Sequence, residues 1–448
     1  MSRISFHRFL VPTLLCLLSA IPALSDSHVR IVRLSMVEGS VKVDRGTGQF
    51  EKAITNLPIT QGMKLRTGDD GRAEVEFENG STVRLSPDSA VQFSDLSLRD
   101  SGTKVSAVEV TKGIAYIEST GSKNDELTVQ FGQEKVAFTH AAHARVGVDE
   151  RGASFAVFKG DLDVDGPSGE IEVKKNQTAD FDFSANDRFT LAKQIQAEPE
   201  DNWDREQDQY HQRYASNSYN KYSPYAYGTS DLAYYGNFFN APGYGMMWQP
   251  YFAGAGWDPF MDGAWSFYPG FGFGWVSAYP WGWTPYHYGN WVFLPGNGWA
   301  WQPGGVWMPM YTQVAVLNAP AGFVAPRAPA TGTGTVIVNR GPASTIATRS
   351  GSKVVIRNNS AGIGVPRGQF DNMAKLSQKV QARGAVTERV STTPADGFGG
   401  MSSGSGSRGG MRSSESRASE PRMSEPHSMS FPSAGSAGSH SSSSAPHK

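Results

Sequence analysis

Two histidines lie close together in residues 139–143, Thr-His-Ala-Ala-His, and paired histidines are common metal ligands. The surrounding residues alternate as in a β-strand, where side chains three positions apart point to opposite faces of the sheet. His140 and His143 therefore make a poor metal pair. We expect a structural or surface role for both.

Three carboxylates recur at every second position in Asp161, Asp163 and Asp165. On a strand they share one face, and oxygen ligands in this arrangement suit Ca²⁺ if other oxygens join them. The alternative is a solvated strand whose charges block pairing with another chain, and this alternative is favoured.

Catalysis needs titratable groups that converge, and the sequence holds no phosphate-binding glycine loop, Ser/His/Asp set or paired-histidine motif in its required context. The sequence therefore predicts a protein that is not an enzyme. No catalytic residue, cofactor or metal site is predicted.

Aromatic rings are the remaining candidates for ligand chemistry. Residues 210–311 hold 15 of the 16 tyrosines, and residues 248–307 hold 10 of the 11 tryptophans. Exposed rings of this kind bind sugars by apolar stacking and cations through their quadrupole. The candidate stacking residues are Trp275, Trp283, Trp291, Trp299, Trp307, Tyr286 and Tyr288.

The favoured alternative is that the rings form the core of this region, because it has hardly any Leu, Ile or Val. Nucleic acid is not an expected partner, since no Lys or Arg is interleaved with the rings between residues 263 and 326. The expected partner is an envelope protein or a polysaccharide.

The N-terminus has the pattern of a secretory signal peptide. Basic residues precede an apolar run over residues 9–20, and small residues precede a cleavage site between Ser25 and Asp26. Cleavage would leave a mature chain without cysteine and without an integral membrane segment. We expect export to the periplasm or the cell surface.

Residues 26–193 read as short strands separated by polar turns. In the clearest hairpin, over residues 72–85, the turn is Asn79-Gly80, a pair that favours the positive φ angles of a tight hairpin. Alternation predicts that Val75, Phe77, Val83 and Leu85 are buried. It places Glu74, Glu76 and Arg84 on the wet face.

This segment resembles the FecR domain over nearly all of residues 30–183. The motifs that carry the resemblance are residues 39–43, 62–68, 73–89, 127–131, 139–146 and 157–164. The resemblance implies an extracytoplasmic all-β fold of packed or solenoid-like sheets, which receives a signal in ferric-citrate type sensors. In those sensors a cytoplasmic anti-sigma segment and a membrane helix precede the domain, so direct control of a sigma factor is not expected here.

The tryptophans show a period of eight residues from Trp275 to Trp307, the length of a short strand and its turn. We expect irregular antiparallel hairpins whose rings stack as ladders. Residues 281–291 and 298–307 resemble the Trp/Tyr repeat that follows a FecR domain in a group of bacterial exported proteins without an assigned activity.

The remaining segments differ in composition and charge. Residues 194–247 are expected to form a polar, Tyr-rich linker, residues 248–311 the aromatic repeats and residues 312–395 a basic mixed segment. That segment has possible strands at 335–338 and 353–357 and a helix at 370–382. Residues 396–448 are rich in Ser and Gly and are expected to be disordered.

Charge is unevenly distributed along the chain. Residues 26–209 carry 33 acidic and 22 basic residues, whereas residues 327–389 carry 10 basic and 2 acidic ones. The two segments are either independent solvated surfaces or attract each other. We predict an exported, non-catalytic envelope protein whose FecR-like domain is a binding or scaffold module. The alternatives are a signal-receiving module, or a glycan-binding protein that uses the aromatic repeats.

Overall fold

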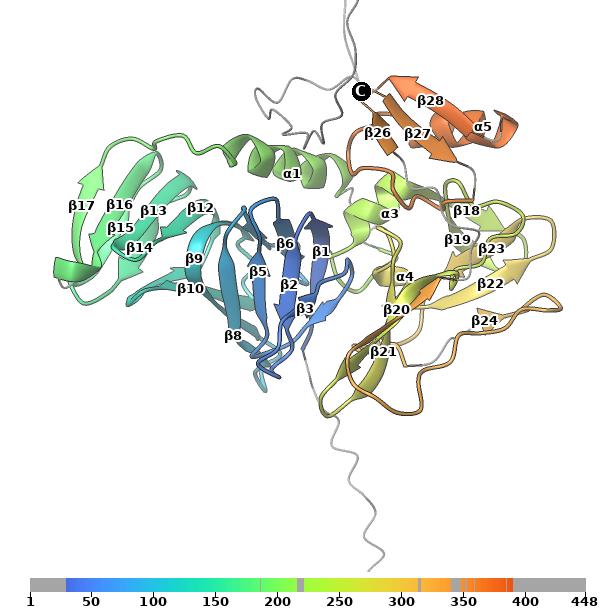
Figure 1. Cartoon of the computed structure of the whole chain (residues 1–448), viewed down its shortest axis with the longest axis horizontal. Helices are drawn as coiled ribbons and strands as arrows, with labels where there is room; N and C mark the ends of the chain where they lie inside the picture. The colour runs from blue at the N-terminus through green and yellow to red at the C-terminus, as the bar shows by residue number, and fades with distance from the viewer. Residues whose placement is uncertain are drawn as a thin grey trace, which may run out of the picture. The chain divides into compact units, whose positions relative to one another are not determined.

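The structure is a computed structural model that describes residues 30–185, 187–215, 221–312, 316–339, 348–350, 353–357, 359–383 and 385–389. Its N-terminal half consists of two β-sheets, which we call sheet A and sheet B (Figure 1). Apart from one short edge strand in each sheet, the strands of both sheets follow chain order, which gives the layered, all-β arrangement that the sequence predicts.

Sheet A contains, in spatial order, β4 (Pro58–Ile59), β1 (Val32–Glu38), β6 (Arg72–Glu76), β7 (Thr82–Leu85), β9 (Lys104–Thr120), β12 (Ala141–Val148), β13 (Gly152–Lys159), β16 (Gln177–Asp182) and β17 (Arg188–Ala192). Sheet B contains β3 (Glu51–Lys52), β2 (Val41–Asp44), β5 (Lys64–Thr67), β8 (Ala90–Leu98), β9, β10 (Asp125–Phe131), β11 (Glu134–Phe138), β14 (Leu162–Asp165) and β15 (Ile171–Val173). All neighbours are antiparallel except β9 and β10, which are parallel.

Strand β9 belongs to both sheets, because its first half pairs with β8 and its second half with β7 and β12. The change occurs at Gly113, which has a φ of +75° and lies where a Cβ would meet the Ser89 backbone at 2.6 Å. Residues 104–120 thus form a single bent strand rather than two short ones.

One apolar core fills the space between the two sheets. Phe131 of sheet B stacks on Phe155 of sheet A with their ring centroids 5.6 Å apart. The predicted hairpin is present as β6 and β7, and the four apolar residues expected to be buried all belong to this core, with exposures of 0–3%. The inner face of the sandwich is therefore the face that the alternation predicted.

The outer face of sheet A differs from the prediction. Glu74, Glu76 and Arg84 point away from the core as expected, yet their exposed fractions are 0%, 2% and 1%. Helix α1 (Asp201–Tyr214), which follows the last strand of the sandwich, covers them. The segment 194–247 differs from the expected linker, since it holds α1, α3 (Thr229–Tyr235) and β18 (Gly236–Ala241).

The aromatic region contains three β-hairpins: β18 with β19 (Gly245–Pro250), β20 (Asp262–Tyr268) with β21 (Gly272–Ser277), and β22 (Asn290–Leu294) with β23 (Gly298–Gln302). Each turn has the sequence Pro-Gly-x-Gly, at residues 242–245, 269–272 and 295–298, and both glycines of every turn have positive φ. Hairpin repeats are therefore confirmed.

The structural repeat is longer than the eight-residue tryptophan period. The three turns are 27 and 26 residues apart, and each hairpin pairs two aromatic rings directly across its strands. These pairs are Phe238 with Trp248, Trp265 with Trp275, and Trp291 with Trp301. The eight-residue series instead combines unlike positions, since Trp283 precedes the short helix α4 (Thr284–His287) and Trp307 lies outside any strand.

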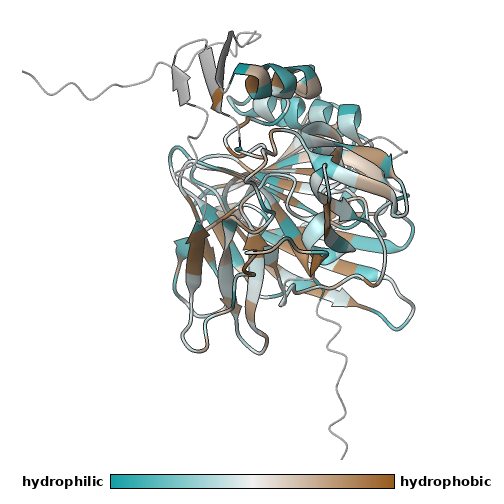
Figure 2. Cartoon of the chain, turned by 90° about the vertical axis from the view of Figure 1, so that its right-hand side faces the viewer, coloured by the Kyte–Doolittle hydropathy of each residue, from teal (hydrophilic) through white to brown (hydrophobic). Residues whose placement is uncertain are grey.

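The rings of these hairpins pack into a second core, and the basic segment completes it. Strand β25 (Thr335–Asn339) pairs with β20, and β24 (Val316–Leu317) pairs with β22. Helix α5 (Met373–Arg383) contributes Met373, Leu376 and Val380 to the core, and Phe370 precedes it there. A small sheet of β26 (Thr348–Ser350), β27 (Lys353–Arg357) and β28 (Ala385–Arg389) lies next to α5. Figure 2 shows hydrophobic and hydrophilic residues side by side along many strands of the molecule.

Candidate functional site

Helix α1 presents a polar stripe to the outer face of sheet A. Asp201, Asp204, Asp208 and His211 are spaced three or four residues apart and so lie on one side of the helix. All four contact charged or polar side chains of the sheet. The contact between helix and sheet is therefore mainly ionic, with Trp203 packing against Met36 and Tyr116, whereas the contact between the two sheets is apolar.

Arg84 lies at the centre of this contact. Its Nε is 2.8 Å from Glu74, and its Nη1 is 2.8 Å from Asp204 and 2.5 Å from Asp208. Although burial opposes its charge, these carboxylates raise the pKa of Arg84 above its ordinary value. A buried cation with several hydrogen-bonded partners compensates for its lost hydration.

Glu74 also binds His211 at 3.0 Å and Arg367 at 2.7 Å. Burial alone would raise the pKa of Glu74, but His211, Arg367 and Arg84 hold it well below its ordinary value. Three chain segments thus converge on one buried carboxylate.

A second buried carboxylate, Asp231 of α3, lies 2.6 Å from Arg33 and 3.2 Å from Arg367. Tyr210 of α1 donates a hydrogen bond of 2.7 Å to it. Arg33 also contacts Glu76 at 3.1 Å. We call these groups, together with Glu74, Arg84, Asp204, Asp208 and His211, the charge layer.

The charge layer continues to the first turn of α1. Asp201 accepts hydrogen bonds from Arg145 at 2.6 Å and from the Tyr116 hydroxyl at 2.8 Å. Arg145 also donates to the backbone oxygen of Gln196 at 2.8 Å, which ties the segment before the helix to the sheet. Sheet A is therefore covered from β1 to β12.

The two histidines considered for metal binding lie apart, as the alternation predicted. His140 is exposed, whereas His143 is largely buried between sheet A and α1. His143 Nε2 is 2.9 Å from Asp204, and its Nδ1 is 3.5 Å from Asp208 and 3.6 Å from Glu118. The partners of His143 are thus acidic residues of another strand and of a helix.

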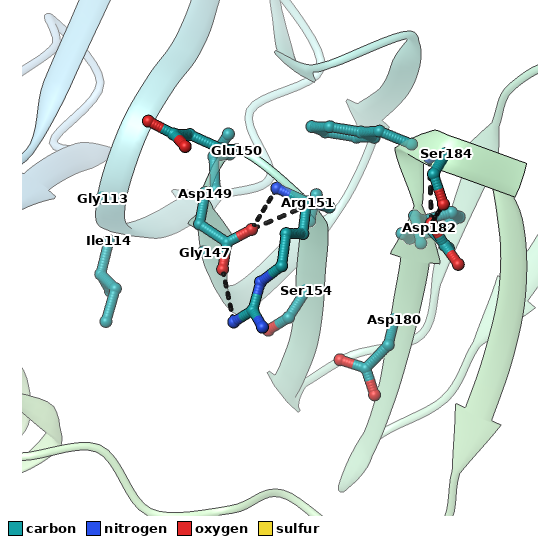
Figure 3. A pocket seen from close by; sticks show the side chains of 15 residues that line it. Gly113, Ile114, Gly147, Asp149, Glu150, Arg151, Ser154, Asp180, Asp182 and Ser184 are labelled. Atoms are coloured by element: carbon teal, nitrogen blue, oxygen red, sulfur yellow. Dashed lines mark hydrogen bonds and ion pairs between the residues drawn. The ribbon is translucent and has the colours of Figure 1, made fainter. Parts of the chain in front are cut away.

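An open groove of about 940 Å³ adjoins the charge layer on the same face (Figure 3). Ile114, Gly147, Ser154 and Asp180 are cross-strand neighbours and form its floor. They lie one row beyond Tyr116 and Arg145, where the cover by α1 ends. The small residues at the centre leave room for a ligand.

Acidic groups surround this groove. Asp149 accepts hydrogen bonds from the backbone of Arg151 and Gly152, and these bonds lower the pKa of Asp149. Ser184 donates to Asp182 through its hydroxyl and its amide, which likewise lowers the pKa of Asp182. Asp149, Glu150, Asp180 and Asp182 stand against the single cation of Arg151. Among its lining residues the groove therefore carries an excess of negative charge.

The aspartates weighed for Ca²⁺ are all exposed on one face of β14 and its preceding turn. Asp161 accepts a hydrogen bond from the backbone of Lys175, and the other two pair across strands with Glu172 and Lys135. Among the described residues, one group of metal-ligating side chains meets at a point, and it consists of Glu118, His143 and Asp208.

Five of the seven candidate stacking residues lie in apolar cores. Their exposed fractions are 3% or less, for Trp275, Trp283, Trp291, Trp299 and Tyr286. Trp307 and Tyr288 are partly exposed. Trp307 stacks on the imidazole of His287, whose burial lowers its pKa to about 4. The five buried rings therefore contact protein. Stacking on a ligand stays a prediction, and only the two partly exposed rings, Trp307 and Tyr288, are accessible for it.

Some predictions fall on residues that the structure does not describe. These are the signal peptide with its cleavage site at Ser25 and Asp26, and the Ser/Gly-rich segment 396–448. Among the described residues, none of the helices has the length and apolar character needed to cross a membrane.

Residues 63–163, from the start of β5 to β14, match the model of the family described as FecR protein. The chain carries a FecR domain. Its outer face bears the charge layer and part of the groove, although Asp180, Asp182 and α1 lie beyond the matched residues.

A second family model, described as a family of unknown function (DUF6600), matches residues 229–330. The match begins at α3 and includes all three Pro-Gly-x-Gly hairpins. The chain thus combines a FecR domain with an aromatic domain of this family.

Two crystal structures of a candidate anti-sigma factor from Parabacteroides distasonis ATCC 8503 are similar to part of the chain, with 16% and 15% sequence identity. Each alignment covers 29% of this chain and 59% of the other, with a TM-score of 0.26. The matched part therefore spans about three fifths of that protein's length. No curated protein matches the chain.

The sequence predictions missed the charge layer and the groove. The charge layer was missed because the inward-facing stripe of a helix is usually apolar, whereas the stripe of α1 consists of Asp and His. A usable signal was present, since these polar residues recur at helical spacing next to strands whose outer positions carry Arg and Glu.

Proposed function

We propose that the FecR domain is a non-catalytic binding module of an exported envelope protein, and that the groove beside α1 is its binding site. The groove itself carries this proposal. It is the part of the outer face of sheet A, among its described neighbours, where small and polar residues lie beside Ile114 and are not covered by α1. Concave sites with a few convergent polar groups are the usual places for ligands.

The charge of the groove favours a protein partner with basic side chains. Hydrogen bonds lower the pKa of Asp149 and Asp182, and Asp180, whose pKa is raised by burial, lies on the floor. A polyanionic glycan would be repelled by these groups, whereas Lys or Arg side chains would form charge-assisted hydrogen bonds.

The charge layer supports a scaffold role for the rest of the chain. It fixes α1 on the outer face of sheet A through buried ion pairs, so the surface that adjoins the groove does not need to be ordered when the partner arrives. The aromatic domain, joined through Asp231 and Arg367, supports α1 from its other side.

Site-specific photo-crosslinking in the native host tests the binding site. A photo-reactive amino acid replaces Ser154 on the groove floor, and a matched control replaces Lys135, which is exposed on β11 of sheet B. We expect a covalent adduct with one protein at position 154 that disappears when Asp180→Lys is added. Equal adducts at both positions, or an adduct that survives Asp180→Lys, would remove the groove as the binding site.

Export is tested separately by the mass of the protein isolated from cell fractions. We expect a chain that begins at Asp26 in the envelope or extracellular fraction. A chain that retains residues 1–25 in the cytoplasmic fraction would contradict export. It would not bear on the groove as a binding site, which the crosslinking experiment tests.

A signal-receiving role is the second candidate, and the match to the FecR family favours it. In that case the partner at position 154 would belong to a signalling pathway, and Asp180→Lys would change the expression of the genes which that pathway controls. A structural partner would be lost without such a change.

A further inference from the structure

The contact between His143 and helix α1 has the composition of a metal site. Three different elements contribute to it, namely Glu118 on β9, His143 on β12 and Asp208 on α1. One ligand atom from each lies within 4.8 Å of the other two. One imidazole and two carboxylates form a ligand set that zinc accepts.

The distances suit a shared ion better than direct hydrogen bonds. His143 Nδ1 is 3.5 Å from Asp208 Oδ2 and 3.6 Å from Glu118 Oε2, which are both beyond the usual hydrogen-bond range. Zinc bonds of about 2.1 Å in a tetrahedral arrangement separate neighbouring ligands by about 3.4 Å. The two distances from Nδ1 are thus already those of a shared ion, whereas the ligand atoms of Glu118 and Asp208, which lie within 4.8 Å of each other, would approach further on binding.

The second ring nitrogen of His143 is also placed as in known zinc sites. Nε2 lies 2.9 Å from Asp204 Oδ2 but, among the described residues, makes no hydrogen bond of good geometry, so a small rotation of the ring would let this carboxylate hold the proton on Nε2 and leave Nδ1 free to bind the ion. A carboxylate behind a ligating histidine fixes its tautomer and strengthens the ligand.

The remaining oxygens of the two carboxylates already have partners. Lys159 lies 3.3 Å from Glu118 Oε1, and Arg84 lies 2.5 Å from Asp208 Oδ1. The oxygens facing His143 are therefore the available ones. Arg84 also contacts Glu74 and Asp204, so its single charge is shared among three carboxylates.

We propose that Glu118, His143 and Asp208 bind one zinc ion that fastens helix α1 to the FecR domain. The ion adds positive charge to Glu118, Asp204 and Asp208, which have only Lys159 and a share of Arg84 when His143 is neutral. A water molecule or a further oxygen completes the coordination. Metal binding would then control how firmly α1 is held on sheet A next to the groove.

The competing explanation is that a proton on His143 supplies the charge. Burial opposes this, while Asp204 and Asp208 raise the pKa of His143. The two explanations differ in one measurable respect, because a protonated histidine needs no metal and a zinc ligand must be deprotonated.

The test uses the untagged mature chain, treated with a chelator and then freed of it. Zinc is titrated calorimetrically at pH 7.5, and Co²⁺ is used as an absorption probe of tetrahedral coordination. We expect a tightest site of one ion per chain. His143→Asn should weaken it by at least about tenfold, and Glu118→Gln, on a different strand, should weaken it similarly.

His140→Asn is the matched control, since His140 is three residues away and exposed. It should leave the tightest site unchanged. The proposal is overturned if the native chain has no site of this stoichiometry, or if a folded His143→Asn or Glu118→Gln chain retains the same affinity and Co²⁺ spectrum. Circular dichroism establishes that each variant is folded, and two variants on separate strands guard against the loss of one of them.

Discussion

Arg84 and its three carboxylates are the clearest example of how single residues hold this molecule together. The guanidinium is 1% exposed and lies between β7 and α1. Removing one member of such a buried group leaves the others without a counter-charge, and this usually costs more than the pair contributes. The charge layer therefore specifies where α1 docks.

We expect Arg84→Met to lower the free energy of unfolding by about 3 to 5 kcal/mol, because Glu74 and Asp204 remain buried without their cation. Urea denaturation followed by circular dichroism measures this loss. Arg99→Met is the control, since Arg99 pairs with Glu126 on the surface and its loss should lower the free energy of unfolding far less. If both variants lost the same free energy of unfolding, the buried ion pairs of the charge layer would not be formed in solution.

Glu134 provides a prediction of pH dependence. Burial, followed by Asp187 and Asp165, raises the pKa of Glu134 to about 7, and its Oε1 has no hydrogen-bond partner among the described residues. In the unfolded chain the pKa would be about 4.3. Between these values the folded chain retains a proton that the unfolded chain has released, so stability falls as the pH rises through this window.

Glu134→Gln should therefore raise the melting temperature at pH 8 and change it little at pH 4.5, because Gln resembles the protonated acid. Differential scanning calorimetry at both pH values measures the effect. Glu170→Gln, at an exposed position, should produce no pH-dependent difference. A melting temperature of Glu134→Gln that stays below that of the native chain at pH 8 would contradict the assignment.

At this scale the sequence predicted which side chains point inward but not which outward side chains are buried. Val75 and Val83 alternate with Glu74 and Arg84, and that alternation is local information. The cover over Glu74 and Arg84 comes from α1 and Arg367, more than 100 residues away. No local pattern in the strands encodes that contact.

Among the elements, the three Pro-Gly-x-Gly hairpins give the aromatic domain its regularity. Their glycines adopt positive φ so that each chain reversal places two rings opposite each other. A residue with a side chain is strained in that conformation. The turns therefore depend on backbone conformation rather than on packing.

Gly296→Ala should lower the free energy of unfolding by about 1 to 2 kcal/mol through backbone strain alone, since φ is +83° and a Cβ there would meet nothing within 4 Å. Gly256→Ala is the matched control, because its surroundings are equally open and its φ is not in this range. Urea midpoints of the two variants test the difference. A loss with Gly256→Ala as large as with Gly296→Ala would indicate another cause.

The strands of the FecR domain could be predicted because their apolar residues alternate, and helix 370–382 was close to the observed α5. Helix α1 could not, because its inward stripe is acidic and its sequence reads as a solvated linker. The eight-residue tryptophan spacing was misleading, since the repeat is carried by the turns at 26 to 27 residues.

Considered as a whole, the described part of the molecule places nearly all of its tryptophans inside. Ten of the eleven have exposed fractions of 8% or less, and Trp307 is the partly exposed one. Large rings replace the missing aliphatic residues, and their edge-to-face contacts stabilise the core.

We therefore expect a blue-shifted tryptophan emission of which acrylamide quenches only a small fraction. Trp307→Phe should abolish most of that quenchable fraction, whereas Trp203→Phe, at a buried position, should not. A large quenchable fraction that persists in Trp307→Phe would show that the rings are open to solvent and to ligands. Titration with envelope polysaccharides then examines stacking on the accessible ring.

The opposite charges of the two chain segments meet inside the molecule at Glu74 and Arg367. The sequence analysis left open whether these segments attract each other, and this contact is one such attraction. The acidic segment 26–209 and the basic segment 327–389 are thus joined by a buried ion pair, without any need for attraction between their surface charges.

Glu74 and Arg367 are 293 residues apart in the chain. The ribosome synthesises β6 long before it synthesises Arg367, which pairs with Glu74 on that strand. Until then the outer face of the FecR domain lacks one of its counter-charges. Long-range contacts of this kind slow folding and expose intermediates. A substitution near residue 367 would therefore impair the folding of the FecR domain. Second-site substitutions that restore folding are expected on strands β6 and β7.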